Sequence, residues 1–468
     1  METPFPATSL DTETQMGQIF FVAPTGDDRD DGSIKHPFAT IEHAIDVARD
    51  NGMDGGDRIF LRAGTYYPTN MLMLLENGGP QRWSLLAAWR NERVVVDGSR
   101  IPPVNGQPAP LIDIEGSYYE ISGLELVGAP KSAISLFGPH VRVIRTVIRD
   151  SGWGAVWSDP VQAACLFFAQ NVVYHNCLMN RPRRLAGGWP SAVNLTHQRD
   201  IVVDNRIYEN YGEAVGTYGT GHYVAHNDLH DNFGVEIYLS NVTDTLVHAN
   251  FIHSDGNEAY FRDWNLKQDW TKPAAFWAPA EGIGMANESS TGIQFARNQV
   301  VDNIIVGPCY RGLNWWNGFF PEGCPPNGGM RDSLIAHNSV VAEAEALFHL
   351  DDNDHAGTEI RDNVFYQRRP DRPLTDFHGV QGITFSHNLR FGGKGSGPAG
   401  EGRGPGDVEK DPRVVDPAGW RAGHYRLRPD SPAINAGIPI GVGLDYFGNE
   451  RPYTDRYDIG AHEWSKDT

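Results

Sequence analysis

A repeated asparagine constrains the fold of this chain more than any other feature of its sequence. Between Asp200 and Ser254, three segments align on Asn205, Asn227 and Asn250, at steps of 22 and 23 residues. A short run rich in β-branched residues precedes each asparagine, and a turn that contains glycine follows. A repeat of this length is typical of a solenoid, because one segment is too short to bury its own apolar face and must stack on its neighbours.

The same phrase recurs on both sides of this stretch. It returns at Asn176 and, more faintly, at Thr146 and Gly123; downstream it returns at Asn298, Asn338, Asn363 and Asn388. The runs between these positions are short and rich in Val, Ile and Tyr, which favours strands over helices. Asparagine tolerates left-handed backbone geometry, and stacked asparagines can bond to one another, so we expect these residues to build the bends between strands. The histidines that precede four of them (175, 226, 337 and 387) share this repeated position and are interpreted as structural.

The opening of the chain adds a second signature. Residues 20–68 read as a strand, a Gly/Asp turn, an amphipathic helix with Thr40 as its N-cap, and a strand that ends in Gly-Thr-Tyr. Together with the repeat, this resembles the right-handed parallel β-helix of the pectate-lyase-like superfamily, over about residues 18 to 390. The resemblance implies an all-β solenoid with an N-terminal capping helix and long loops on one side. It implies no single reaction, because the fold carries lyases, hydrolases, epimerases, transferases and binding proteins.

The resemblance and the composition predict three regions. Residues 1–17 form a loose arm, residues 18–390 form the β-helix with its N-terminal cap, and residues 391–468 form a Gly-rich linker and a C-terminal segment. We expect that segment to cap the last coil or to fold back along the side of the solenoid.

The formal net charge of −20 argues against a nucleic-acid partner and against an anionic membrane surface. No stretch is long and apolar enough to span a membrane, and no signal peptide is visible near the start. The resemblance nevertheless implies an extracellular or periplasmic location. The oligomeric state stays open. The four cysteines form no CxxC pair, so no zinc site is predicted. Cys309 and Cys324 flank one loop, and they either form a disulfide that closes it or are both free thiols.

Three coils carry insertions, at residues 180–191, 255–281 and 314–329. All three fall between a turn and the next repeated asparagine, so we expect them to project from one side and to wall a groove. They are rich in aromatic residues, whose flat faces suit sugar rings. The predicted substrate platforms and contacts are Trp189, Tyr238, Trp264, Arg311, Trp315 and Trp316.

Carboxylates in the same coils are the candidate catalytic groups. Strand alternation turns Val235 inward and sends Glu236 and Tyr238 outward, and Glu213 opens the preceding strand. Glu281 opens the strand of the following coil and Glu288 closes it. Neighbouring coils lie roughly 4.8 Å apart, so such carboxylates fall within the roughly 5–10 Å that glycosidases use. We therefore predict a glycoside hydrolase with Glu213 and Glu236 as the first-choice pair, then Glu288 and Glu281, and with no metal; Asp263 and Asp269 are reserves.

Two alternatives remain open. A polysaccharide lyase would use a base and a cation, drawn from groups such as Tyr238 and Arg311, or from Arg183, Arg184, His197 and Tyr218. The run Asp351, Asp352 and Asp354 offers oxygen ligands for Ca²⁺, although an Asp-rich turn is the commoner meaning of such a run. The other alternative is a glycan-binding protein without catalysis. In all three cases the expected partner is a carbohydrate.

Overall fold

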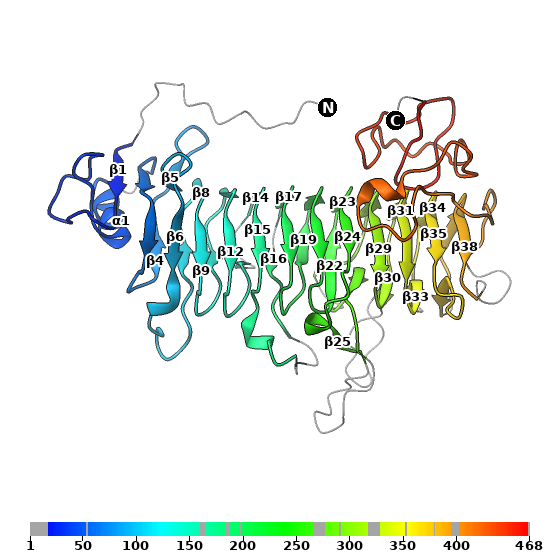
Figure 1. Ribbon diagram of the computed structural model, residues 1–468, viewed down its shortest axis with the longest axis horizontal. Coiled ribbons are helices and arrows are strands. Elements are labelled where there is room, and N and C mark those ends of the chain that lie inside the picture. Colours follow the sequence, from blue (N-terminus) through cyan, green and yellow to red (C-terminus); the bar gives the residue numbers. More distant parts are fainter. Residues whose placement is uncertain are drawn as a thin grey trace.

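The computed structural model describes residues 17–52, 55–159, 164–183, 185, 188–196, 198–264, 277–289, 292–316, 328–351, 353–378, 380–394 and 402–466. Their strands form three long parallel sheets of 13, 11 and 12 strands, in which each strand pairs with the equivalent strand of the next coil. Figure 1 shows the coils stacked along one axis, with α1 (Ile41–Asp50) at one end. The predicted all-β solenoid is confirmed.

Each sheet takes one strand from each coil. The 13-stranded sheet holds β1 (Ile19–Val22), β2 (Arg58–Leu61), β5 (Ser84–Ala88), β8 (Tyr119–Ser122), β11 (Val141–Ile144), β14 (Leu166–Ala169), β17 (Ile201–Val203), β20 (Tyr223–Ala225), β23 (Leu246–His248), β28 (Gln299–Val301), β31 (Leu334–Ala336), β34 (Thr358–Arg361) and β37 (Ile383–Ser386). The 11-stranded sheet holds β4 (Leu72–Leu74), β7 (Ile112–Ile114), β10 (Ile134–Leu136), β13 (Val156–Ser158), β16 (Val193–Leu195), β19 (Val215–Thr220), β22 (Val235–Thr243), β27 (Glu281–Ala286), β30 (Arg311–Trp316), β33 (Ala346–Leu350) and β36 (Thr375–Phe377).

The 12-stranded sheet holds β3 (Gly64–Tyr66), β6 (Val94–Asp97), β9 (Glu125–Val127), β12 (Val147–Arg149), β15 (Val172–Tyr174), β18 (Arg206–Tyr208), β21 (Asp228–His230), β24 (Phe251–His253), β29 (Ile304–Pro308), β32 (Ser339–Glu343), β35 (Val364–Gln367) and β38 (Leu389–Gly392). One antiparallel hairpin, β25 (Arg262–Asp263) and β26 (Trp277–Ala278), stands outside these sheets. Short 3₁₀ turns lie at η1 (Gly98–Arg100), η2 (Leu178–Asn180), η3 (Glu258–Tyr260) and η4 (Ala422–Tyr425).

The N-terminal helix covers the first coils as predicted. The Thr40 side chain accepts a hydrogen bond from the backbone N–H of His43 at 3.2 Å and so caps the helix. Ile41, Ala44 and Ala48 are buried on one face of α1, and they join the core that the first strands enclose. The helix thereby closes the end of the solenoid, where apolar side chains would otherwise meet water.

A ladder of asparagine side chains runs through the bends. Each backbone N–H and each side-chain amide donates to the Oδ1 of the next asparagine, for example from Asn205 to Asn227 at 3.0 and 2.9 Å. Eight asparagines form this column: Asn171, Asn205, Asn227, Asn250, Asn303, Asn338, Asn363 and Asn388. The stacking prediction is confirmed, because a buried amide must find partners and the neighbouring coil supplies them.

Two details of the predicted column are wrong. Asn176 belongs to a second ladder, with Asn210 and Asn232, and Asn298 bonds to Thr245 and Ser333 in another bend. The left-handed residue is the one before each asparagine, such as His226 at φ 55°, and the asparagine itself is outside that region. The Asn side chain therefore serves the ladder while its predecessor makes the bend.

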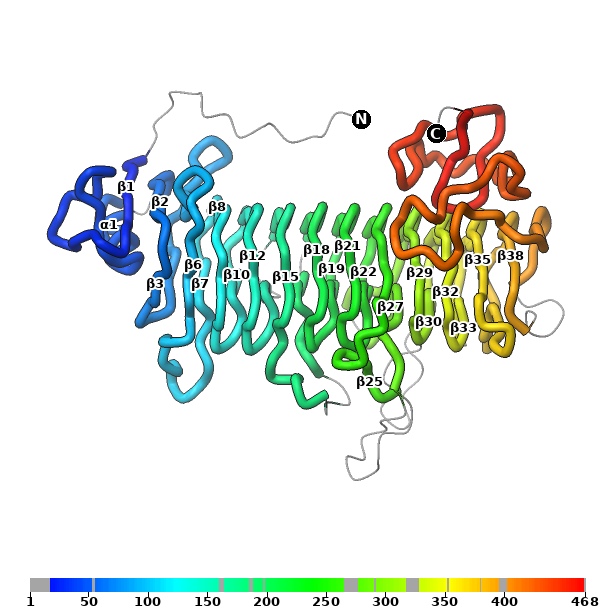
Figure 2. The backbone as a smooth tube through the Cα atoms, in the orientation of Figure 1, coloured from blue at the N-terminus to red at the C-terminus, as the bar shows by residue number. Residues whose placement is uncertain are grey.

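The C-terminal segment folds back along the 12-stranded sheet. Val414, Tyr425 and Ile459 pack on Ile304, Val364 and other outward residues of that sheet in one apolar cluster. Figure 2 shows this segment lying over the last coils, beside β29 and β35. Of the two predicted arrangements, the segment adopts the one along the side.

An arginine anchors this segment. The buried Arg451 guanidinium donates to Asp302 Oδ1 and contacts His337 Nδ1, both at 2.8 Å. It also donates to the Gly460 carbonyl at 2.8 Å. One side chain therefore ties the C-terminal segment to two bends of the solenoid.

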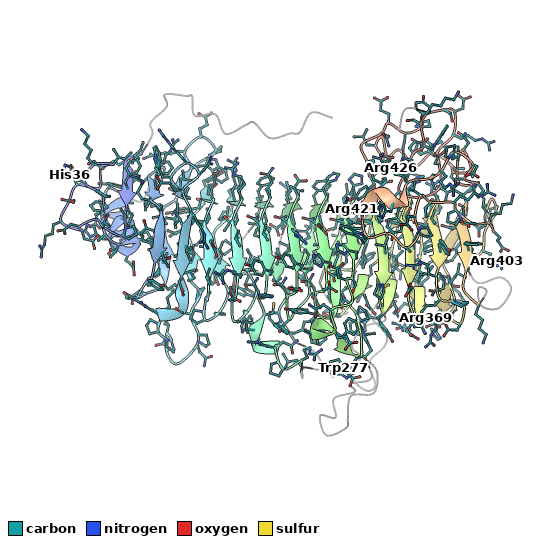
Figure 3. The ribbon with its side chains drawn as sticks, in the orientation of Figure 1. His36, Trp277, Arg369, Arg403, Arg421 and Arg426 are labelled. Carbon is teal, nitrogen blue, oxygen red and sulfur yellow. The ribbon has the colours of Figure 1, made fainter. Side chains whose placement is uncertain are left out.

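The structure also shows the state of three cysteines and the side from which the inserted loops project. Cys165, Cys177 and Cys309 are free thiols, so of the two alternatives for Cys309 the structure has the thiol; Cys324 lies outside the described residues. The described parts of the first two insertions project from the same side of the solenoid, near β16 and β25 in Figure 1. Trp277 lies on this side in Figure 3.

Candidate active site

One row of outward-facing residues crosses the middle of the 11-stranded sheet. Val215, Ile237 and Ile283 pair in register inside the core, so the residue after each of them points outward by strand alternation. The outward row, taken along the sheet, is Asn194, Gly216, Tyr238, Gly284, Asn314, His349 and Asp376. The two glycines leave room above the sheet on either side of Tyr238, and the candidate carboxylates occupy that room.

Glu213 lies above Gly216. One of its carboxylate oxygens is 3.1 Å from the position that a Cβ on Gly216 would take. Trp189 Nε1 donates to Oε1 at 3.2 Å, and the Ser191 hydroxyl donates to Oε2 at 2.9 Å. Burial raises the pKa of Glu213 to about 7, and the charge of Glu288 adds to that rise. A carboxyl group with this pKa carries a proton through much of the neutral range.

Glu281 lies above Gly284, on the far side of Tyr238. Its Oε2 is 3.4 Å from the position of a Cβ on Gly284, and it accepts from the Asn314 amide at 2.8 Å. Arg311 Nη1 is 3.8 Å from Oε1. Burial raises the pKa of Glu281, while the Arg311 guanidinium and the Asn314 amide act against that rise. The two buried carboxyl groups therefore lie in different electrostatic surroundings.

Tyr238 stands between these two carboxyl groups. Trp316 Nε1 donates to the Tyr238 hydroxyl at 3.0 Å, and the nearby charges of Glu288 and Glu213 add to the effect of burial in raising the Tyr238 pKa. Glu288 itself is exposed and accepts from the Ser240 hydroxyl at 3.2 Å. Glu213, Tyr238, Glu281 and Glu288, all predicted from the sequence, are thus brought together on one face.

Residues of the first two insertions build a wall beside this face. The Arg262 guanidinium lies over the rings of Trp189 and Trp264, at 4.6 and 4.3 Å. Trp264 stacks on Tyr310 with ring centroids 4.0 Å apart. Arg262 and Tyr310 both pack on the Trp264 ring, and a sugar would have to compete with these contacts, so the role predicted for Trp264 as a sugar platform stays a prediction. Trp189 acts through its N–H, which holds Glu213.

Two other predicted site residues belong to the interior of the solenoid. Glu236 bonds to the backbone N–H and the side-chain amide of Asn232, at 3.0 and 2.6 Å, and so ends the second asparagine ladder. Val235, and not Glu236, lies against Gly284 on the outer face. The alternation rule failed here because the strand is still leaving a bend at these residues. Trp315 is fully buried and donates to Asn353 at 2.9 Å, so it is a core residue.

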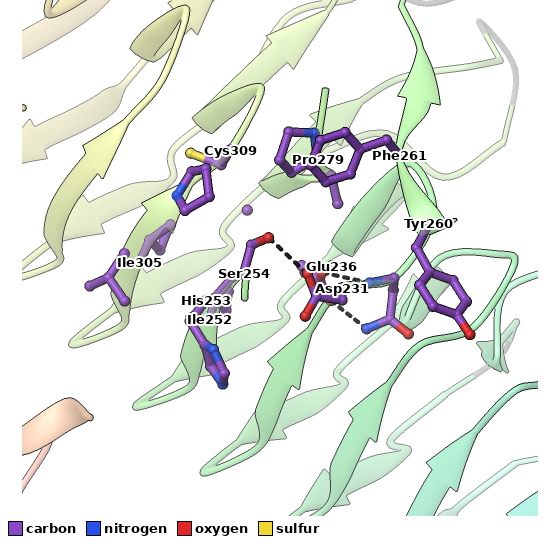
Figure 4. Close-up of a pocket in the computed structure, with 15 residues that line it drawn as sticks. Asp231, Glu236, Ile252, His253, Ser254, Tyr260, Phe261, Pro279, Ile305 and Cys309 are labelled. Atoms are coloured by element: carbon purple, nitrogen blue, oxygen red, sulfur yellow. Dashed lines mark hydrogen bonds between the residues drawn. The ribbon is translucent and has the colours of Figure 1, made fainter. Parts of the chain in front are cut away.

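Glu236 also lines a pocket together with Asp231 and Asn232. Figure 4 shows Asp231, Ser254 and Glu236 in its wall with their hydrogen bonds, close to Tyr260 and Cys309. Burial raises the pKa of Glu236 to about 8. Its hydrogen bonds all run to Asn232 in the ladder, so the raised pKa reflects burial in a structural position.

The reserve catalytic residues and the predicted calcium ligands have separate outcomes. Asp263 is buried in the β25–β26 hairpin, whereas Asp269, Arg184 and His197 lie outside the described residues. Asp351 is 3.0 Å from His349 Nε2, and Asp354 bonds to Arg331 at 2.5 Å. These two members of the predicted calcium run therefore point to different partners; Asp352 is not among the described residues.

Sequence reasoning missed three residues of the site. Ser191 and Asn314 each donate to one candidate carboxylate, and Arg262 holds the wall together. Asn314 stands at the outward position of β30, so the register of the strands would have found it. Arg262 stands between aromatic residues in the second insertion, but its contact with Trp189 depends on how two loops meet in space.

Comparison with known proteins identifies the fold. Residues 20–178 match the family model described as Pel9A-like, right handed beta helix region. A pectate lyase PEL9 of Emericella nidulans is 32% identical over 122 residues, and an uncharacterized protein YwoF of Bacillus subtilis is 27% identical over 151 residues. These alignments span 24% and 29% of this chain and only 28% and 31% of the two relatives.

Two solved structures match nearly the whole chain. Pectate lyase Pel9A has a TM-score of 0.55 at 16% identity, covering 97% of this chain and 98% of its own. XylC in complex with xylose has a TM-score of 0.59 at 11% identity, covering 95% of this chain and 98% of its own. The chain therefore has the right-handed parallel β-helix fold, and its first coils match the Pel9A-like family model.

The family match stops short of the candidate site. The model ends at residue 178, before Trp189 and Glu213. The family model thus covers the first coils and their cap, and the chemistry has to be argued from this chain's own residues. Among the described residues, no helix is long and apolar enough to cross a membrane.

Proposed function

We propose that the protein is a carbohydrate-active enzyme, and specifically a glycoside hydrolase that uses Glu213 as its general acid and Glu281 as its general base. The observation that carries the proposal is the pair of buried carboxyl groups above Gly216 and Gly284, of which Glu213 has a pKa of about 7. A general acid must hold its proton at working pH and release it in the transition state, and a pKa near 7 suits that task.

The spacing of the pair supports an inverting reaction. Gly216 and Gly284, above which the two carboxyl groups lie, are two coils apart, or about 9.6 Å at the usual strand spacing, which is near the upper end of the inverting range. Inverting glycosidases separate their carboxyl groups by roughly 6.5–9.5 Å, and retaining ones by about 5–5.5 Å. The wider distance leaves room for a water molecule beside the sugar ring.

The proposed step follows from these positions. Glu213 gives its proton to the glycosidic oxygen as the bond from that oxygen to the anomeric carbon breaks. Water attacks the anomeric carbon from the opposite side and gives a proton to Glu281. Arg311 and Asn314 hold Glu281 in place, and Tyr238 with Trp316 offers the sugar a surface between the two carboxyl groups.

A polysaccharide lyase is the second candidate. The arginines Arg262 and Arg311 favour it, because both lie beside the candidate carboxylates and could neutralise the carboxylate of a uronate sugar. The pectate lyase in the comparisons points the same way. A lyase would leave an unsaturated sugar at the cleavage point, whereas a hydrolase adds the elements of water.

Isotope-labelled water separates the two candidates. The protein is incubated in ¹⁸O-water with a panel of neutral and uronate glycans, with a chelator control, and the products are read by mass spectrometry. The proposal expects products that carry one ¹⁸O atom and that lose this signal in Glu213→Gln but not in the matched Glu236→Gln variant. Unsaturated products without ¹⁸O would establish the lyase, and binding without any product across the panel would establish a glycan-binding protein.

A further inference from the structure

Two adjacent coils present a square of histidine and aspartate side chains at the edge of the candidate site. His349 of β33 pairs in register with Asp376 of β36. The residue two positions after each of them is again an acid or a histidine, namely Asp351 and His378. Strand alternation turns positions i and i+2 to the same face, so the sequences His-Leu-Asp and Asp-Phe-His stack with opposite residue types side by side.

We propose that His349, Asp351 and His378 bind a borderline divalent metal ion such as Zn²⁺, with Asp376 orienting the histidines. Each of the three offers one ligand atom, and these atoms lie within 4.8 Å of one another. Two imidazole nitrogens and a carboxylate oxygen match the donors that zinc takes in catalytic sites, where a fourth position stays open to water or substrate.

The distances fit a metal between the side chains. His349 Nε2 and Asp351 Oδ1 are 3.0 Å apart, within hydrogen-bond distance, and a metal bound between them would replace that hydrogen bond. Two ligand atoms bound to one metal at about 2.1 Å each are themselves about 3.0–3.4 Å apart in octahedral or tetrahedral geometry. The pair is therefore already separated by about one edge of a coordination polyhedron.

Asp376 plays the part of an orienting group. Its Oδ2 lies 2.8 Å from His349 Nδ1, and its Oδ1 lies 3.2 Å from His378 Nε2. A carboxylate on one ring nitrogen fixes the tautomer and leaves the other nitrogen to the metal. His349 is buried, and its place is set by the register of two strands, so this half of the site is rigid.

The location suggests what the metal would do. His349 follows Asn314 in the outward row, so the square lies about one coil, roughly 5 Å, from the residue that holds Glu281. A metal ion there would meet the sugar units next to the scissile bond, through a carboxylate or a pair of hydroxyl groups. The positive charge of Arg311 acts on His349 and Asp376, and the two aspartates of the square outweigh it at His349.

Metal binding is testable without a substrate. Chelator-treated protein is titrated with Co²⁺, which reports its geometry by visible absorption, and then with Zn²⁺, which is counted by plasma mass spectrometry after dialysis. We expect one ion per chain, loss of that ion in His378→Ala and in Asp351→Asn, and roughly 10–100-fold weaker binding in Asp376→Asn.

A second cluster provides the matched control. Asp228, His230 and His253 also bring ligand atoms within 4.8 Å of one another, on the 12-stranded sheet. His253→Ala removes a histidine there and leaves the proposed square intact, so it should still bind one ion. The proposal is refuted if the wild type takes up no metal at micromolar Zn²⁺, or if His253→Ala loses the ion while His378→Ala keeps it. Because the readout is metal content, it is independent of whether the enzyme proves to be a hydrolase.

Discussion

Replacing Glu213 with glutamine tests the central claim about the site, which is that burial keeps this carboxyl group protonated near neutral pH. Glutamine has nearly the same shape and cannot ionise. Trp189 Nε1 can still donate to the amide oxygen, and the Ser191 hydroxyl can accept from the amide nitrogen in place of donating. The variant therefore resembles the protonated form of the wild type at every pH.

The expected stability change follows from the pKa. Folding raises the pKa of Glu213 from 4.5 to about 7, and each pKa unit corresponds to about 1.4 kcal/mol. Between these two values the folded state binds the proton more tightly than the unfolded state, so wild-type stability falls as pH rises through this window. The wild type and Glu213→Gln should differ little in this term at pH 4. At pH 8 the variant should be more stable by about 3 kcal/mol.

Urea unfolding followed by tryptophan fluorescence, at pH 4 and at pH 8, measures this difference. Many other acids titrate over the same range, so only the change in the wild-type-minus-variant difference is informative. Glu92→Gln is a control of opposite sign, because hydrogen bonds from Arg62 lower the pKa of Glu92 and its charge stabilises the folded state at high pH. If the stability difference for Glu213→Gln is the same at both pH values, Glu213 ionises normally and the reasoning about the site fails.

Three further substitution experiments follow from the same structure. Glu281→Gln should lower kcat by about 10²–10⁴-fold, measured on whichever glycan the panel identifies, whereas Glu236→Gln should change it less than tenfold because that side chain faces the asparagine ladder. Trp315→Ala should lower the free energy of unfolding by about 3–5 kcal/mol, because Trp315 is a core residue. Trp316→Ala should leave most of the stability unchanged and raise KM, because Trp316 lies at the surface beside Tyr238. The reverse pattern would contradict these two assignments. Arg451→Met should lower the free energy of unfolding by about 3–5 kcal/mol, measured by thermal or urea unfolding, because it leaves the buried Asp302 carboxylate without its Arg451 partner. A loss below about 1 kcal/mol would show that the arginine anchor is dispensable.

Much of the solenoid could be read from the repeat because each coil repeats the same local problem. A strand, a bend and a buried amide recur at nearly constant spacing, and the amide needs a partner in the next coil. That logic predicted Asn205, Asn227 and Asn250 correctly. It misplaced Asn176 and Asn298, since each lies five residues from the main column, in a bend of similar sequence.

The candidate site could be predicted only in part. Strand alternation identified Tyr238 because it lies well inside a regular strand. The same rule failed for Glu236, which stands where the chain leaves a bend, and the aromatic count misjudged Trp315, which the register turns inward. Trp264 is in the predicted loop, but its ring stacks on Tyr310, which comes from a different coil, and Arg262 of its own loop lies over it.

The sequence by itself determined the class of fold, the capping helix and the coils in which the carboxylates lie, because these depend on short-range periodicity and on residue type. Only the tertiary structure decided which carboxylates share a face and what their pKa values are. Burial and hydrogen bonding at Glu213 arise from Trp189 and Ser191 in the preceding coil, and those at Glu281 arise from Asn314 in the following one. Such contacts depend on the register between coils and on the path of the inserted loops, which no local pattern specifies.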